Sequence, residues 1–140
     1  MAVNTASQSL SHTTAVRVYI EDTDAGGIVY YVNYLKFMER ARTELMRALG
    51  YSKAAIFADD FMFVVHSLQV NYRAPARLDD ELLVSAKVLK VGKAAVVFEQ
   101  SVCLADQVLC EGEVKLALVR RSDQKPVAMP DTLRAQLKNS

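Results

Sequence analysis

Residues 33–50 read NYLKFMERARTELMRALG and form the longest periodic segment of the chain. Apolar residues recur in it at steps of three and four, while charged residues fill much of the opposite face, as in an amphipathic helix. Gly50 supplies the stop, because glycine enters the left-handed C-terminal conformation at little cost. Asn33 is a permissible N-cap. The apolar positions of this predicted helix are Tyr34, Leu35, Phe37, Met38, Ala41, Leu45, Ala48 and Leu49.

The segments on both sides of this helix have the alternation of β-strands. Before it, apolar and polar residues alternate up to Glu21, which predicts a strand that begins at Ala15. A helix with a broad apolar stripe needs a sheet to cover it, so we expect an α+β domain with a helix packed on a curved antiparallel sheet. The later elements are expected as strands at 61–72, 81–91, 94–105 and 108–119, joined by short hairpins, and a short helix at 131–137.

The composition is typical of one globular domain. The chain has 140 residues, of which 51% are hydrophobic and 24% charged, and its formal net charge is +1. A core of this size needs no disulfide or metal staple. The basic residues are scattered, which argues against a nucleic-acid binder. No apolar run reaches the ~20 residues of a membrane span.

The N-terminal segment, residues 1–14, is rich in Ser and Thr. We expect it to be a flexible arm, followed by a single domain over residues 15–140. It has no charged start followed by an apolar core, so a cytoplasmic location is expected. Cys103 and Cys110 lack C-x-x-C spacing and clustered histidines, so we expect buried free thiols and no metal site.

The densest chemistry lies in residues 21–31, EDTDAGGIVYY, between the first strand and the helix. A calcium loop is rejected because Asp22 and Asp24 are too few ligands. A phosphate cradle is weakly supported, because no Gly-x-Gly-x-x-Gly or Walker sequence is present. Acyl transfer fits better, since a carboxylate here can act on a carbonyl whose oxygen is bound by helix N-terminal amides. Spacing alone nevertheless favours a structural turn.

Three blocks resemble the 4-hydroxybenzoyl-CoA thioesterase family. They are YIEDTDAGGIVYY with the following Asn33 and Tyr34, FMERARTE at residues 37–44, and YRAPARLDD at residues 72–80. Within the family, the chain is most similar to the bacterial acyl-CoA thioesterases associated with the Tol–Pal cell-envelope system. The resemblance extends from about Val16 to Pro130.

This resemblance implies a hot-dog fold, in which an antiparallel sheet wraps a long central helix. It also implies hydrolysis of an acyl-CoA to the free acid and CoA, without a metal or redox cofactor. Members of the family join their sheets as homodimers, often pair again into homotetramers, and have the active site at the dimer interface. The acyl group is not predicted.

The resemblance assigns roles to individual residues. Asp24 matches the catalytic carboxylate, acting as nucleophile or general base on the thioester. Tyr31 matches the residue whose backbone N–H polarises the carbonyl. Gly27 is expected to let the backbone approach the substrate, and Asp22 to order the loop. Many hot-dog enzymes have a histidine where this chain has Ile28, although the Tol–Pal branch usually has an apolar residue there.

Other positions are expected to bind the substrate. Lys90 and Lys93 are the nearest equivalents of the basic residues that hold CoA phosphates in the family. Tyr30 is a candidate for the acyl pocket, and so is His66, although a lone histidine at the end of an apolar run is more often structural.

Two alternatives to a thioesterase stay open. The first is a non-catalytic module that binds acyl-CoA or acyl carrier protein on the same fold. An intact Asp24 favours the enzyme. The second is a hydratase or dehydratase, which typically uses a His-containing motif that this sequence lacks.

Overall fold

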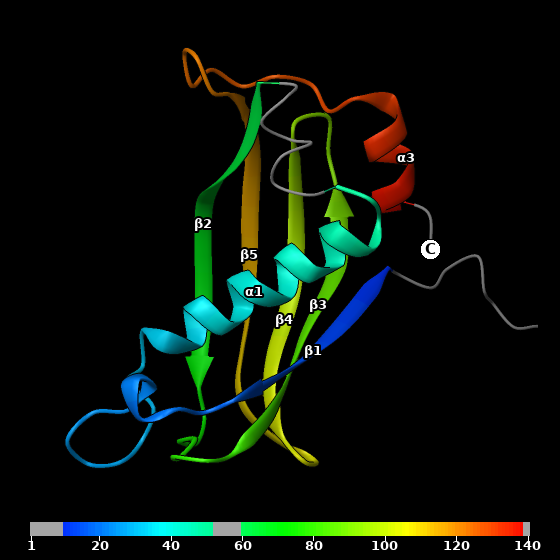
Figure 1. Ribbon diagram of the computed structural model, residues 1–140. Helices are drawn as coiled ribbons and strands as arrows, with labels where there is room; N and C mark the ends of the chain where they lie inside the picture. The colour runs from blue at the N-terminus through cyan, green and yellow to red at the C-terminus, as the bar shows by residue number, and fades with distance from the viewer. Residues whose placement is uncertain (1–9, 52–59, 139–140) are drawn as a thin grey trace, which may run out of the picture.

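The computed structural model describes residues 10–51 and 60–138, and the statements below refer to these residues (Figure 1). Its elements follow the order strand, long helix, four strands and short helix, with one turn of 3-10 helix (η2) before the long helix. Their bounds are β1 Ser11–Arg17, η2 Ile20–Asp22, α1 Asn33–Ala48, β2 Phe61–Tyr72, β3 Glu81–Val91, β4 Ala95–Leu104, β5 Gln107–Arg120 and α3 Asp131–Lys138.

The five strands form one antiparallel sheet in the order β1-β3-β4-β5-β2. Helix α1 lies across one face of this sheet and packs on β1, β3 and β4 (Figure 1). The predicted α+β architecture, a long helix against a curved antiparallel sheet, is confirmed. Strand β2 forms one edge of the sheet, on the side where α1 begins.

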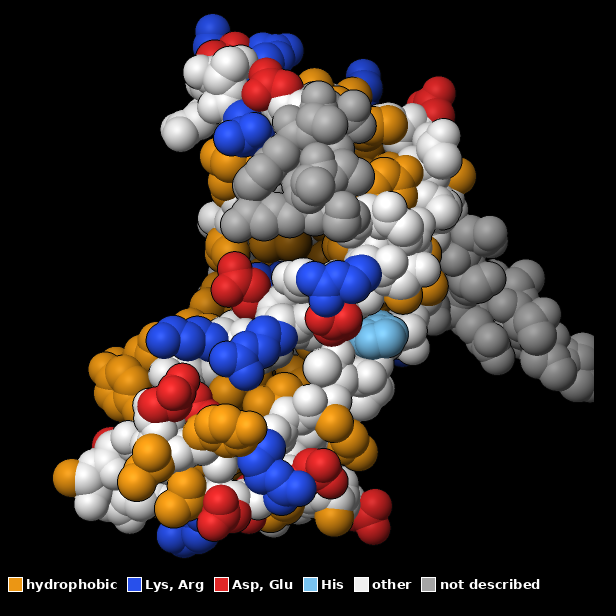
Figure 2. All heavy atoms as spheres, viewed as in Figure 1, with side chains coloured by type: hydrophobic (Ala, Val, Ile, Leu, Met, Phe, Trp, Pro, Cys, Tyr) orange, Lys and Arg blue, Asp and Glu red, His pale blue; other side chains and the backbone are white. Residues whose placement is uncertain are grey.

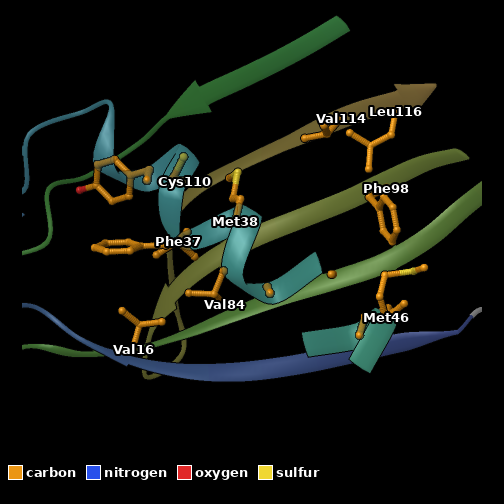
Figure 3. Close-up of a cluster of buried hydrophobic side chains, with 14 of the residues drawn as sticks. Val16, Phe37, Met38, Met46, Val84, Phe98, Cys110, Val114 and Leu116 are labelled. Atoms are coloured by element: carbon orange, nitrogen blue, oxygen red, sulfur yellow. The ribbon is translucent and has the colours of Figure 1, made fainter. Parts of the chain in front are cut away.

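The core lies between α1 and the inner face of the sheet (Figure 3). Phe37 and Met38 of α1 are fully buried there, as the helical periodicity predicts. Residues of β3 alternate between buried and exposed, so Val84 faces the helix. Gln100 is the polar exception in this layer. Its side-chain amide donates to the Met38 carbonyl at 2.9 Å, which satisfies the buried polar group.

The two ends of α1 differ in how well the sequence predicts them. Gly50 adopts a φ of +93°, and its N–H donates to the Arg47 carbonyl while that of Tyr51 donates to Met46, so the expected glycine stop is confirmed. At the other end Asn33 is not the N-cap. It is the first helical residue after Val32, and its side chain turns to Asp22 instead.

The N-terminal boundary also differs from the expectation. Residues 11–14, expected in the flexible arm, belong to β1 and pair with β3 from Ser11 opposite Lys87. Ser and Thr favour loops by composition, but here they lie on an edge strand. Residues 1–9 lie outside the described residues. The strand also ends early, at Arg17, because the Asp22 carboxylate accepts the Tyr19 N–H at 2.9 Å and folds the chain into η2.

The remaining expectations agree with the structure in outline. The predicted terminal helix is α3, and the hairpin strands are β3, β4 and β5. Both cysteines are free, but only Cys110 is buried as expected, because Cys103 is half-buried near the hairpin end of β4. No helix among the described residues is long and apolar enough to cross a membrane.

Candidate active site

The acidic loop folds into a small antiparallel ladder beside the main sheet. The Asp24 N–H donates to the Ile28 carbonyl at 3.0 Å, and the Tyr30 N–H donates to the Asp22 carbonyl at 2.9 Å. Gly27 makes the reversal with a φ of +81°, in a region that favours glycine. The ladder keeps residues 22–24 beside residues 28–30 and leads directly into α1.

Asp24 is exposed and only partly engaged. One of its carboxylate oxygens, Oδ1, accepts the Gly26 N–H at 2.8 Å, which fixes the side chain over the turn. Among the described residues, the other oxygen has no hydrogen-bond or ion-pair partner. This leaves a fixed carboxylate with an oxygen available for attack on a carbonyl or for removing a proton from water.

The start of α1 presents unpaired amide groups. The Asn33 N–H donates to the Tyr30 carbonyl at 2.8 Å, which closes a tight turn over Tyr31 and Val32. Within the described part of the chain, the N–H groups of Tyr31 and Val32 have no acceptor. They lie at the positive end of a 16-residue helix and can donate to an oxygen that gains negative charge.

Buried polar contacts join this ladder to the helix. The Asp22 carboxylate, 7% exposed, accepts the side-chain amide of Asn33, 8% exposed, at 3.1 Å. A second contact runs from Tyr34, whose phenolic oxygen accepts the Ala76 N–H at 2.8 Å. The expected ordering role of Asp22 is consistent with the first contact. The roles of Asn33 and Tyr34 are not evident from residue type, because both lie in a helical pattern.

A cluster of tyrosines lines a cavity beside the unpaired amides. The ring of Tyr72 lies 5.9 Å from that of Tyr31, edge to face, and 5.7 Å from that of Tyr34. Burial raises the pKa of both Tyr34 and Tyr72, so both hydroxyls are protonated at neutral pH. The cavity, about 270 Å³, is lined by Ile28, Val29, Tyr31, Tyr34, Tyr72, Arg73, Ala74 and Pro75.

A second hollow of about 220 Å³ runs along α1 toward β2. It begins at Val32, next to the unpaired amides, and reaches Arg42. The Arg42 guanidinium donates to the Gln100 side chain at 2.9 Å, and burial lowers its pKa. Most of the lining is apolar, which suits an acyl chain. The lining residues are Val32, Leu35, Lys36, Met38, Glu39, Arg42, Val65, Leu68 and Val114.

The structure brings some of the predicted site residues together and separates others. Asp24, Gly27 and Tyr30 lie on the ladder and Tyr31 follows it directly, with the Tyr30 and Tyr31 rings 5.0 Å apart. His66 is exposed at an irregularity of β2 and lines neither hollow.

Lys90 and Lys93 lie at the far end of β3 from the ladder. The Gly27 carbonyl accepts the Leu78 N–H just before β3 begins. Lys90 lies near the opposite end of this 11-residue strand, and Lys93 lies in the connection to β4; both are about 30 Å or more away at ~3.3 Å per residue. Within one chain they therefore lie far from Asp24.

Comparison with known proteins assigns the class of this protein, a thioesterase. The chain belongs to the thioesterase superfamily, which it matches over residues 26–111. It is 43% identical to the acyl-CoA thioester hydrolase YbgC of Escherichia coli O6:H1, over 88% of this chain and 92% of that protein. It is also 43% identical to the acyl-CoA thioesterase YbgC of Haemophilus influenzae, over 86% and 89%.

Solved structures show the same fold. A probable thioesterase from Bartonella henselae superimposes with a TM-score of 0.81 at 30% identity, over 86% of this chain and 99% of that one. A 1,4-dihydroxy-2-naphthoyl-CoA thioesterase from Synechocystis gives a TM-score of 0.83 over 91% and 95%. At 21% identity the second likeness concerns the fold alone.

Proposed function

We propose that this protein hydrolyses an acyl-CoA thioester to the free acid and CoA. The observation that carries the proposal is that, among the described residues, one Asp24 oxygen has no partner and the Tyr31 N–H, directly after the same short ladder, has no acceptor. The names of the relatives that are 43% identical supply the thioester and its acyl-CoA class. The apolar hollow at Val32 supports an acyl chain beside these groups.

The proposed mechanism uses the two groups in turn. The Tyr31 N–H donates to the thioester oxygen as it becomes negative. Asp24 acts in one of two ways. It attacks the carbonyl carbon, expels the CoA thiolate and leaves an anhydride that water cleaves, or it takes a proton from a water that attacks directly. Both routes release a carboxylic acid and CoA, and neither requires a metal or redox cofactor.

We also propose that the active unit is a homodimer joined through β2. Among the described strands this edge strand has no partner on its outer side, and edge strands of this kind pair readily with another chain. Val65 is 56% exposed and Leu68 43% exposed, in continuity with the hollow along α1. Leu68→Lys is expected to yield monomers in light scattering, with Leu89→Lys, an exposed leucine on β3, as the control.

Dimerisation gives the distant lysines a role. Because Lys90 and Lys93 lie far from Asp24 in their own chain, we propose that they bind the CoA phosphates at the site of the second chain. Acyl carrier protein thioesters are included as possible substrates. The homotetramer, the cytoplasmic location and the link to the Tol–Pal system stay predictions from the family resemblance.

Thiol release from a panel of acyl-CoAs tests the carboxylate. The panel runs from short to long aliphatic chains and includes a hydroxybenzoyl ester. Asp24→Asn is expected to lower kcat at least about 100-fold, while Asp106→Asn, an exposed hairpin carboxylate, leaves it unchanged. Equal activity of wild type and Asp24→Asn would contradict the mechanism. If neither protein acts on any ester, including acyl carrier protein thioesters, the enzyme hypothesis is wrong and the non-catalytic binding module becomes the proposed function.

The oxyanion role of the amide has its own test. Tyr31 occupies the second position of a turn closed by the Asn33 N–H and the Tyr30 carbonyl, with Val32 in the α region. Proline is favoured at that position and has no N–H. Tyr31→Pro is expected to lower kcat about 100-fold or more relative to Tyr31→Ala, which removes the same phenol but keeps the amide. Equal rates for the two variants would refute the amide's role.

A further inference from the structure

Few contacts fix Asp24 and the Tyr31 amide relative to each other. Asp24 and the Tyr31 amide are joined by the ladder of residues 22–30, which has only two backbone hydrogen bonds between its sides. This ladder lies outside the five-stranded sheet. The Asp22–Asn33 contact ties one side of the ladder to α1, and a second support holds its other side.

Residues 76–78 provide the outer support of the ladder. The Val29 N–H donates to the Ala76 carbonyl at 2.8 Å, and Ile28 bridges to Arg77. Val29 and Ala76 are both buried. The position of Val29, and with it that of Asp24 and Tyr31, thus follows the position of Ala76.

Ala76 is in turn held by α1. Its N–H has one acceptor among the described residues, the Tyr34 phenolic oxygen at 2.8 Å. Tyr34 lies in the first turn of α1, only three residues after Tyr31, and is 3% exposed. The contacts therefore close a ring from Tyr34 to Ala76, to Val29, and back along the chain to α1.

We propose that Tyr34 is a positioning residue, whose phenol holds the Asp24 ladder and the Tyr31 amide in a fixed relative geometry through Ala76. The inference rests on the proposed function for its catalytic consequence. Tyr34 acts through backbone groups and not on substrate, because its oxygen is buried against Ala76. The aromatic side chain of Tyr34 packs edge to face on Phe37 at 6.3 Å. Tyr34→Phe therefore removes the hydrogen bond to Ala76 and retains this packing.

Steady-state kinetics with Tyr34→Phe tests the catalytic consequence. We expect kcat to fall about tenfold with KM within about twofold, at a temperature well below the Tm of each protein. The control is Leu137→Ala, which destabilises α3 away from the ladder and should lower Tm without lowering kcat. If Tyr34→Phe lowers Tm but leaves kcat unchanged, Tyr34 is a structural residue only and the proposal is wrong.

Hydrogen exchange tests the closed ring of contacts among Tyr34, Ala76 and Val29 without a measurement of activity. The peptide over residues 22–32 is expected to exchange about tenfold faster in Tyr34→Phe than in wild type, and to be unchanged in Leu137→Ala. Unchanged exchange in Tyr34→Phe would overturn the ring. An inactive wild type with faster exchange in Tyr34→Phe would refute the proposed function and the catalytic role of Tyr34, while the ring itself would stand.

A measurement on wild type covers the case in which Tyr34→Phe does not fold. In mild denaturant, the amides of Val29, Tyr30 and Ala76 are expected to open with one common dependence on denaturant concentration, because the ring joins them. Independent opening of the Ala76 and Val29 amides would contradict the proposal.

Discussion

Gly112 of β5 lies directly against the backbone of Gln69 in β2, so closely that a Cβ at Gly112 would stand 2.4 Å from the Gln69 carbonyl oxygen. The same Cβ would lie 3.0 Å from a methyl carbon of Val70. Only glycine allows the two strands to approach in this way. The edge strand β2, and Tyr72 at its end, depend on this approach for their position.

Gly112→Ala is therefore expected to destabilise the fold by about 1–3 kcal/mol, because β2 must move away from β5. Urea denaturation measures the change. Gly92→Ala is the matched control, since its Cβ would come no closer than 3.5 Å to another atom, the Ala95 carbonyl oxygen. Equal losses in the two variants would show that the close approach is not the cause.

A second prediction concerns the Asp22–Asn33 contact. Asn33→Asp places two buried carboxylates in contact, which raises the pKa of the pair in the folded state. The folded protein then binds more protons than the unfolded one, so stability falls as pH rises above about 4. We expect a loss of at least about 2 kcal/mol at pH 7.5 and a smaller loss at pH 5.

The charge-swapped protein provides the control for this pair. Asp22→Asn combined with Asn33→Asp restores one carboxylate and one amide, and the new Asn can still accept the Tyr19 N–H. Tm of the double variant should exceed that of Asn33→Asp at pH 7.5. A double variant as unstable as the single one would mean that the amide–carboxylate pair is not what stabilises this corner.

Alanine variants at two glycines distinguish the effect of backbone strain on stability from its effect on catalysis. Gly27 and Gly50 both have positive φ, and a Cβ at either position would meet no atom within 4 Å. Alanine at either position is therefore expected to lower the free energy of unfolding by about 1–2 kcal/mol, through φ strain alone. Gly27→Ala should also lower kcat, because Gly27 reverses the ladder that carries Asp24, whereas Gly50→Ala should not. Equal kcat values in the two variants would argue against a strain-sensitive ladder.

The alkaline limit of stability depends on Cys110. Burial raises the pKa of this thiol to about 11, from an ordinary value of 9.0. The folded state keeps its proton while the unfolded state loses it, so the stability contribution is complete below pH 9 and is lost between pH 9 and 11. The loss is roughly 2–3 kcal/mol.

Denaturation at a series of pH values checks this. Cys110→Ala is expected to be less stable than wild type at pH 8 because of the cavity, but to lose less stability between pH 9 and 11. Cys103→Ala, at a half-buried thiol, should retain the wild-type slope. A wild-type slope in Cys110→Ala would assign the alkaline loss to other groups.

The long helix and the hairpin strands were predictable because their signals are periodic and local. Phe37 and Met38 occupy positions that only a buried helical face explains, and Gly50 marks the end of that face. The start of the helix was less predictable. Asn33 is a common N-cap by residue type, but its partner is Asp22, which only the folded loop brings near.

The candidate site could be read from the sequence only in part. Asp24 and Tyr31 could be named through the family motif, whereas composition and spacing alone favoured a turn. Tyr72 could not be placed with Tyr31, because the two are joined by the register of β2 on β5 and not by proximity in sequence. The distance of Lys90 from the ladder could not be predicted either, because it follows from the contact of Gly27 with Leu78 just before β3 begins.

The ladder of residues 22–30 has a consequence for how such a protein diversifies. The groups assigned to bond cleavage lie on this ladder and at Tyr31 directly after it, whereas the hollow suited to an acyl chain is lined by residues of α1 and β2, including Val65 and Leu68. Exchanging these two side chains reshapes the hollow without altering any hydrogen bond of the ladder. Selectivity can therefore drift between lineages while the reaction chemistry is inherited intact.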